Sequence, residues 1–355
     1  MCPLTLPSPQ GEGTKTTTIV AMQSIPCTNR DTETIFTYNQ MSHTVSGILI
    51  PFVESFERQA IASSPDFQQS TGEESIIISH TAPQIVSPTY EIAFKDQDYI
   101  LSDHARAMRI QMEMDKPEWH MQQAGIRSTI IVFGSARFIS SNKAQRLLEK
   151  ANEELAANPN CKEAKAAVAK AECQMKTSVY YDQARKFAQI VARDTMKDYP
   201  PNYEGPFDYV ICTGGGPGIM EAGNRGAYDV GAPSIGLNIK LPYEQHPNPY
   251  TSPHLCFQFH YFNVRKLHFM LRAKALVCSP GGYGTFDELF EGLTLRQTER
   301  MQKIPIVLLG MEFWNKCVNF EYLAEIGVIC PEDLKLFHLT DSPQEAWDVI
   351  KAFYR

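Results

Sequence analysis

The clearest pattern along the chain is a series of short apolar runs separated by segments with helical spacing. Runs of strand length occur at 128–133, 207–213, 233–239, 255–259, 275–278, 304–309 and 336–339. Amphipathic helices are predicted between most of them, for example over 180–196, 219–230 and 313–325, with a last helix capped by Asp341 or Ser342. Strands that alternate with helices predict an α/β fold with a doubly wound, mostly parallel sheet.

The first hundred residues lack this pattern. Residues 1–40 are rich in Thr, Ser, Pro and Gln, and the short apolar runs that follow show no domain-like spacing. We expect a disordered or weakly structured arm over 1–100 and an N-terminal helix over 101–124, interrupted near Pro117. One domain, over 125–355, is then expected to carry the chemistry.

The 143–177 segment and the N-terminal helix are both expected to be helical and to lie outside the binding site. Residues 143–177, rich in Ala, Glu and Lys and broken at Asn158, predict a helical hairpin that is inserted into the domain with a solvated charged surface. A separate helix over 180–196 follows it. The N-terminal helix carries an apolar stripe that is typical of a core or of a dimer contact: Met108, Met112, Trp119 and Met121.

Charge and cysteine content restrict the classes of partner and ligand that this protein is expected to bind. A net charge of −7 and the lack of a basic run argue against a nucleic-acid binder. The nine cysteines are scattered without a CxxC pair, and the histidines show no metal-ligand spacing, so we expect reduced thiols, no metal site and a cytoplasmic protein. No apolar segment of about 18 residues occurs, so no membrane association is expected.

Three predicted strands end in loops of small residues: Gly134–Arg137, Gly214–Gly218 and Ser279–Thr285. In a doubly wound sheet, such loops meet at the carboxyl edge, where helix N-termini present free N–H groups to anions. We therefore expect a small phosphorylated ligand there. The dinucleotide fingerprint is absent, because Ile219 holds the position of its third glycine, and no Walker lysine follows either glycine-rich loop.

Glu288 has two interpretations. With Thr285 it forms a capping-box pattern, which needs no function. Alternatively, a helix start that keeps it ionised would make it a base or a counter-charge beside a ribose phosphate, with Asp287 and Glu291 as further candidates. Arg265 and Lys266, in the first turn of a helix that Asn263 would cap, indicate either a nearby anion or two solvated side chains.

The motifs PGGYGTFDE (280–288) and GGGPGIMEA (214–222), with the Arg265–Lys266 pair, resemble the LONELY GUY family, long labelled lysine-decarboxylase-like proteins. The resemblance covers about 125–355. It implies a Rossmann-like fold and a cofactor-independent phosphoribohydrolase that cleaves nucleoside 5′-monophosphates, of the AMP or cytokinin riboside type, to base and ribose 5-phosphate. It also implies a homodimer or higher homo-oligomer with shared active sites.

The resemblance assigns roles by position. It implies a catalytic pair, Arg265 and Glu288; a phosphate cradle of Gly281, Gly282, Gly284 and Thr285; and nucleotide contacts at Ser135, Gly214, Gly215, Gly216, Met220 and Lys266. The long arm and the 143–177 insertion depart from compact family members. Lysine decarboxylation is disfavoured, since no distinctive motif provides a Schiff-base lysine for pyridoxal phosphate. A non-catalytic nucleotide or cofactor sensor of the same fold is the alternative.

Overall fold

The structure is a computed structural model that describes residues 82–200, 203–242 and 246–355. Residues 82–90 belong to one compact unit and 91–355 to another. Most of the arm expected over 1–100 lies outside the described residues. Its described part contains helix α2 (Pro83–Val86), the 3-10 turn η2 (Pro88–Tyr90) and helix α3 (Gln97–Leu101).

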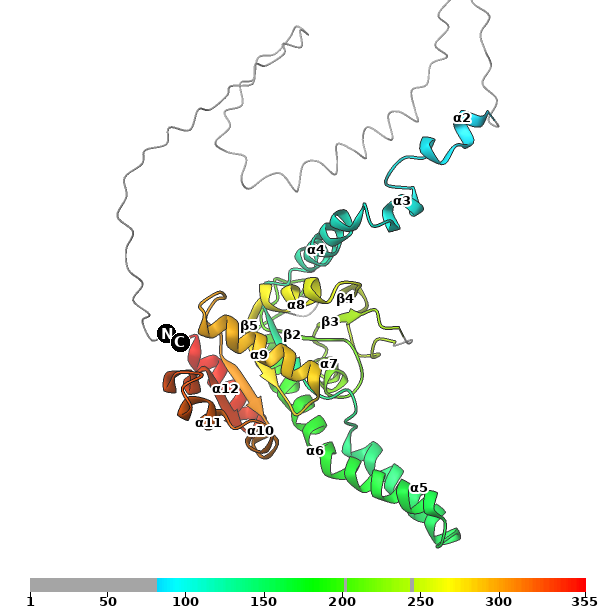
Figure 1. The fold of residues 1–355 in the computed structure, drawn as a ribbon. Helices are drawn as coiled ribbons and strands as arrows, with labels where there is room; N and C mark the ends of the chain where they lie inside the picture. The colour runs from blue at the N-terminus through cyan, green and yellow to red at the C-terminus, as the bar shows by residue number, and fades with distance from the viewer. Residues whose placement is uncertain (1–81, 201–202, 243–245) are drawn as a thin grey trace, which may run out of the picture. The chain divides into compact units, whose positions relative to one another are not determined.

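Within the described residues, seven parallel strands form one sheet in the order β4-β3-β2-β1-β5-β6-β7 (Figure 1). This confirms the expected α/β, doubly wound architecture. The strands are β1 (Thr129–Phe133), β2 (Val210–Thr213), β3 (Ser234–Ile239), β4 (Cys256–Phe259), β5 (Ala273–Cys278), β6 (Ile306–Leu309) and β7 (Phe337–Thr340).

Alternation along each strand supplies two cores, one on each face of the sheet. In β1, Ile130 and Val132 join one core, whereas Ile131 and Phe133 join the other. The first core is covered by α6 (Lys162–Met196), α7 (Ile219–Tyr228) and α12 (Pro343–Phe353). The second is covered by α4 (Arg106–Gln123), α8 (Phe262–Leu271), α9 (Tyr283–Gln297), α10 (Met311–Cys317) and α11 (Phe320–Glu325). Short 3-10 turns, η3 (Pro253–Leu255) and η4 (Pro331–Leu336), precede β4 and β7.

The strand order reverses beside β1. The chain moves outward from β1 through β2, β3 and β4, and then returns so that β5 pairs with the other side of β1. Ile131 of β1 accordingly lies between Cys212 of β2 and Leu276 of β5. A reversal of this kind leaves a crevice outside the carboxyl ends of the two central strands, which is where open α/β sheets bind ligands.

Three helix predictions were wrong in detail. Helix α4 runs without a break through Pro117, whose ring is buried, so packing offsets the missing backbone hydrogen bond. The hairpin of α5 (Ser141–Ala157) and α6 forms, but α6 continues to Met196 as one helix, because neither Gly nor Pro interrupts it (Figure 1). Conversely, the helix expected over 313–325 is divided at Val318, where the backbone is extended and Asn319 caps α11.

The apolar stripe predicted on the N-terminal helix is only partly buried. Met121 of α4 is 2% exposed and joins the core, whereas Met108, Met112 and Trp119 are 45%, 58% and 51% exposed. The apolar stripe of α4 therefore divides between the core and the surface. No helix in the described ranges is both long and apolar enough to cross a bilayer.

Candidate active site

The three loops that follow β1, β2 and β5 meet at Ser135. We call them the β1 loop (134–137), the β2 loop (214–218) and the β5 loop (279–282). The Ser135 N–H donates to the carbonyl of Pro280 at 2.9 Å, and the Ser135 carbonyl accepts from the N–H of Ile219 at 2.9 Å. The structure thus brings together the loops that the sequence placed at one edge, at the crevice beside β1 and β5.

The glycines of the β2 loop are needed for packing. A Cβ atom at Gly214 would lie 2.8 Å from the Met220 sulfur, and one at Gly218 would lie 2.2 Å from the Ser135 carbonyl oxygen. Gly215 and Gly218 have φ of 71° and 73°, a conformation that side chains disfavour. Gly214, Gly215 and Gly216 are buried and Met220 is half-buried. The loop therefore forms a filled wall of the crevice.

A buried amide network that sequence reasoning missed holds this wall. The Asn248 side-chain nitrogen lies 3.1 Å from the Gly215 carbonyl and 3.0 Å from the Gly216 carbonyl, and its backbone N–H donates to Gly215 at 2.8 Å. Asn224 accepts from Asn248 and from Thr213 at 2.9 and 2.7 Å. Asn248 belongs to a proline-rich segment of the sequence, and a lone Asn there gives no distinctive signal.

The β5 loop is open where the β2 loop is filled. A Cβ atom at Gly281 would meet the Thr285 hydroxyl at 2.1 Å and the Ser135 nitrogen at 3.0 Å, so Gly281 permits the contact between the loops. At Gly282 and Gly284, however, a Cβ atom would meet nothing within 4 Å, and both residues are exposed. An anion can therefore approach this backbone closely.

The capping box predicted for Thr285 and Glu288 does not form. Helix α9 begins at Tyr283, its N-cap is Gly282, and no side chain caps it. The Thr285 N–H already donates to the Gly282 carbonyl at 2.9 Å, because the glycines let the helix start three residues earlier than the pattern indicated. The first N–H groups of α9, at Tyr283 and Gly284, have no acceptor within the helix, and both residues are exposed.

Arg265 and Glu288 come together from two helices. The Arg265 guanidinium on α8 lies 3.9 Å from Glu288 on α9, and their side chains are 15% and 4% exposed. It also lies over the rings of Phe262 and Phe269, at 5.2 and 5.6 Å from their centroids. Among the residues that the structure describes, neither Arg265 Nε nor Glu288 Oε2 has a hydrogen-bond partner. Buried polar atoms without partners are typical of sites that bind a ligand.

Burial raises the pKa of Glu288 to about 7, although Arg265 and Lys266 act to lower it. This pKa differs from the expectation that the helix start keeps the carboxyl ionised. Glu288 lies in the second turn of α9, beyond the reach of the free N–H groups, and loss of hydration outweighs the dipole. A carboxyl group with this pKa can both accept and release a proton near neutral pH.

Lys266 is held by two carboxylates. Its ammonium lies 2.8 Å from Asp287 and 3.2 Å from Glu291, both on α9. Although burial acts to lower it, these hydrogen bonds raise the pKa of Lys266. Lys266 therefore ties α8 to α9, and both further candidate carboxylates are already engaged. The helix that carries it begins after Tyr261, so the cap predicted at Asn263 was wrong.

No group of three or more His, Cys, Asp or Glu side chains within the described ranges could hold a metal ion.

Comparison with known proteins agrees with this geometry. Residues 220–350, which include α8, the β5 loop and α9, match the family described as "Possible lysine decarboxylase". A probable cytokinin riboside 5′-monophosphate phosphoribohydrolase of Oryza sativa subsp. japonica is 26% identical over 153 residues, which span 41% of this chain and 68% of the relative. Over these residues the chain is similar to the LONELY GUY family. The resemblance inferred from the motifs is thereby confirmed.

Solved structures with similarity to this chain include two that are named for the molybdenum cofactor. The molybdenum cofactor binding protein from Rippkaea orientalis is 16% identical, with 50% of this chain and 90% of that chain covered and a TM-score of 0.36. The Moco carrier protein from Chlamydomonas reinhardtii is 16% identical, with 64% and 97% covered and a TM-score of 0.35.

Proposed function

We propose that this protein hydrolyses the N-glycosidic bond of nucleoside 5′-monophosphates and releases the free base and ribose 5-phosphate. The observation that carries the proposal is the buried Arg265–Glu288 pair beside an open glycine loop at a helix N-terminus. The family supports a phosphoribohydrolase, and the rice relative is named for cytokinin riboside 5′-monophosphate. We propose AMP or a cytokinin riboside monophosphate as the substrate.

The phosphate would bind where the backbone is open. The free N–H groups at the start of α9, with the Thr285 hydroxyl behind them, suit the 5′-phosphate. Gly282 and Gly284 keep this surface clear of side chains. With the phosphate held there, the ribose extends along the crevice beside Ser135 toward the Arg265–Glu288 pair.

Glu288 would then act on the sugar. As the C1′–N bond breaks, its electron pair leaves with the base, and the carboxylate stabilises the positive charge that develops at C1′. Water adds to C1′ and gives a proton to Glu288. With a pKa of about 7, Glu288 can pass that proton to the departing base, which balances the reaction.

Arg265 would keep Glu288 ionised enough to act. Its guanidinium lowers the carboxyl pKa, and its unpartnered Nε can donate to the substrate. We also propose a homo-oligomer, because α4 and α8 together expose Met112, Trp119, Phe262 and Leu267. An exposed apolar surface of this kind suits a second copy of the chain.

A substrate panel tests the proposal. Purified protein is incubated with AMP, GMP, CMP, UMP and a cytokinin riboside 5′-monophosphate, and the base and ribose 5-phosphate are quantified by chromatography. We expect equal amounts of both products from at least one nucleotide and none with Glu288→Gln. Tight binding by calorimetry without release of base from any nucleotide would instead indicate a nucleotide sensor.

A further inference from the structure

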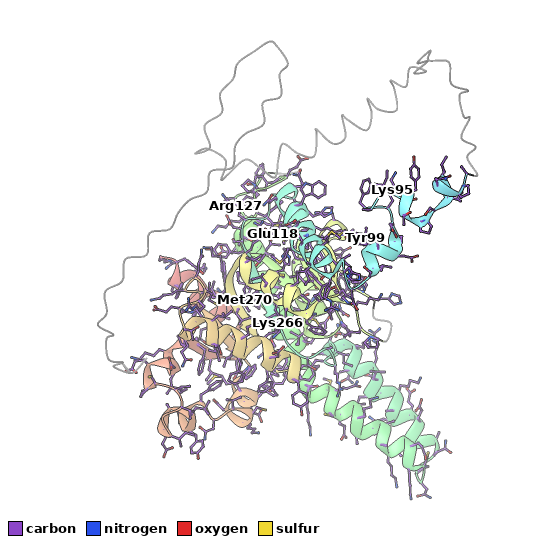
Figure 2. All side chains as sticks on the ribbon, turned by 45° about the horizontal axis from the view of Figure 1, so that its top comes forward. Lys95, Tyr99, Glu118, Arg127, Lys266 and Met270 are labelled. Carbon is purple, nitrogen blue, oxygen red and sulfur yellow. The ribbon has the colours of Figure 1, made fainter. Side chains whose placement is uncertain are left out.

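Helix α4 lies before the sheet begins and outside the residues that match the family, 220–350. It nevertheless packs against α8, the helix that carries Arg265. Figure 2 shows Glu118 on α4 beside the helix that carries Lys266 and Met270. Two carboxylates of α4 contribute to this contact, one at each end of α8.

Glu113 binds the start of α8. One of its carboxylate oxygens accepts from the His260 N–H at 2.7 Å and the other from the Tyr261 N–H at 3.1 Å. Tyr261 is the N-cap of α8, and its own side chain makes no capping hydrogen bond. Glu113 therefore supplies, from another helix, a cap for the two N–H groups that lead into α8, with charge-assisted bonds and a charge that suits the helix dipole.

Glu118 binds the end of α8. Its carboxylate lies 2.6 Å from the guanidinium of Arg272, the C-cap of α8, and 3.6 Å from Nδ1 of the buried His268. The contact with His268, followed by the hydrogen bond with Arg272, lowers the pKa of Glu118 despite its burial. The other ring nitrogen of His268 lies 3.0 Å from the Glu113 carbonyl oxygen.

Arg265 lies between these two anchors. Its backbone N–H donates to the Tyr261 carbonyl at 3.2 Å, so Arg265 sits one turn from the residue that Glu113 binds. Its guanidinium is 3.9 Å from Glu288, at the outer limit of an ion pair. A shift of about 1 Å in α8 would therefore change the interaction between the two side chains, and displacements of that size alter rates strongly.

We propose that α4 is a positioning element for the catalytic pair, in which Glu113 and Glu118 fix the two ends of α8 and so hold Arg265 against Glu288. The proposal rests on the proposed function, and it adds two positioning residues outside the family match. The contacts that the structure gives for the two carboxylates, within the described part of the chain, do not involve Arg265 or Glu288.

The test compares Glu113→Gln and Glu118→Gln with Asp115→Asn. Asp115 is a carboxylate of the same helix, and it accepts a hydrogen bond only from Gln111 among the contacts of α4 that the structure gives. We expect kcat to fall about tenfold in each glutamate variant, equivalent to about 1.4 kcal/mol. KM should change less than twofold, because the phosphate cradle belongs to α9. Asp115→Asn should match the wild type.

A second readout separates positioning from simple stabilisation. Glu288 is faced by Arg265 and Lys266 from α8, by Asp287 and Glu291 from α9, and by Cys278 from β5. Of these, Arg265 lowers its pKa most. Loosening α8 should therefore move the midpoint of the pH–rate profile upward, and amide hydrogen exchange should rise across 260–272. If both variants melt at lower temperature but keep the wild-type kcat and midpoint, the proposal is wrong.

The positioning proposal can also be tested if the proposed function is wrong. Should the wild type release no base, the Glu288 carboxyl is titrated directly by isotope-edited infrared spectroscopy in the wild type and in both variants. An upward shift in the variants, absent in Asp115→Asn, supports positioning without catalysis. If the titration of Glu288 and the amide hydrogen exchange across α8 are both unchanged in the variants, the positioning proposal is wrong. Two independent variants keep the test available if one does not fold.

Discussion

The β2 loop and the β5 loop have similar sequences but opposite surroundings. Both are rich in glycine and follow central strands. In the β2 loop, Gly214 and Gly218 are glycines because any side chain would collide with a neighbour. At the end of the β5 loop and the start of α9, Gly282 and Gly284 face open space beside a buried, unpartnered carboxyl group. The same residue type thus closes one wall of the crevice and exposes backbone for a ligand on the other.

This difference predicts how the two regions respond to substitution. Changes in the β2 loop should reduce stability, since its glycines and the Asn248 network hold the wall in place. Changes around the β5 loop and α9 should reduce turnover while leaving stability nearly intact. Each prediction below addresses one side of the comparison.

Apart from Glu288→Gln, replacing Arg265 should have the largest effect on turnover. In Arg265→Ala, the buried Glu288 loses its counter-charge, so turnover should fall about a thousandfold, within the range for positioned acid–base groups. Arg296→Ala is the matched control, because Arg296 lies on α9 but over the ring of Phe353. Steady-state kinetics of base release measures both. A turnover within twofold of wild type in Arg265→Ala would remove the pair from the mechanism.

Gly218→Ala should be the most destabilising change in the β2 loop. Its φ of 73° and the collision with the Ser135 carbonyl should together lower the free energy of unfolding by about 3 kcal/mol. Gly231→Ala isolates the conformational cost, since Gly231 has a similar φ of 76° with no atom within 4 Å, and should cost about 1 kcal/mol. Urea denaturation compares the two. Equal losses would show that packing in the β2 loop is unimportant.

Gly284→Ala should separate stability from binding. The added methyl group meets no protein atom, and Ala favours the helix, so stability should rise by about 0.5 kcal/mol. The same methyl group would occupy phosphate space, so KM should increase about tenfold, equivalent to about 1.4 kcal/mol. Thermal melting and kinetics test both effects. An unchanged KM would place the phosphate elsewhere.

Much of the fold was accessible from the sequence. The strands end in glycine loops after apolar runs, and parallel topology then forces those loops to one edge, so Ser135, Gly218 and Gly281 could be placed near one another in advance. These placements depend on local pattern and topology, which the sequence displays. The pair of Arg265 and Glu288 was implied by the family resemblance of the motifs, and the structure brings the two side chains within 3.9 Å.

Other features depend on contacts that no local pattern encodes. The capping box at Thr285 failed because flexible glycines allowed α9 to begin at Tyr283. The raised pKa of Glu288 follows from burial under α8, which its position in α9 does not reveal. Asn248 and Glu113 act on backbone groups far away in sequence, and single polar residues in a loop or on a helix give no signal of such roles.

The pH dependence of base release tests the central claim most directly. The claim is that the Glu288 carboxylate is the working group at the site. With the best nucleotide of the panel, kcat/KM should rise from pH 5 to pH 9 with a midpoint near 7, because protonation below that pKa removes the carboxylate. Glu288→Gln should be inactive throughout and remain stably folded. A rate that does not depend on pH over this range would contradict the claim. So would a Glu288→Gln variant that keeps wild-type turnover but loses about 0.5 to 2 kcal/mol of stability, which is the loss expected when a helix cap is removed.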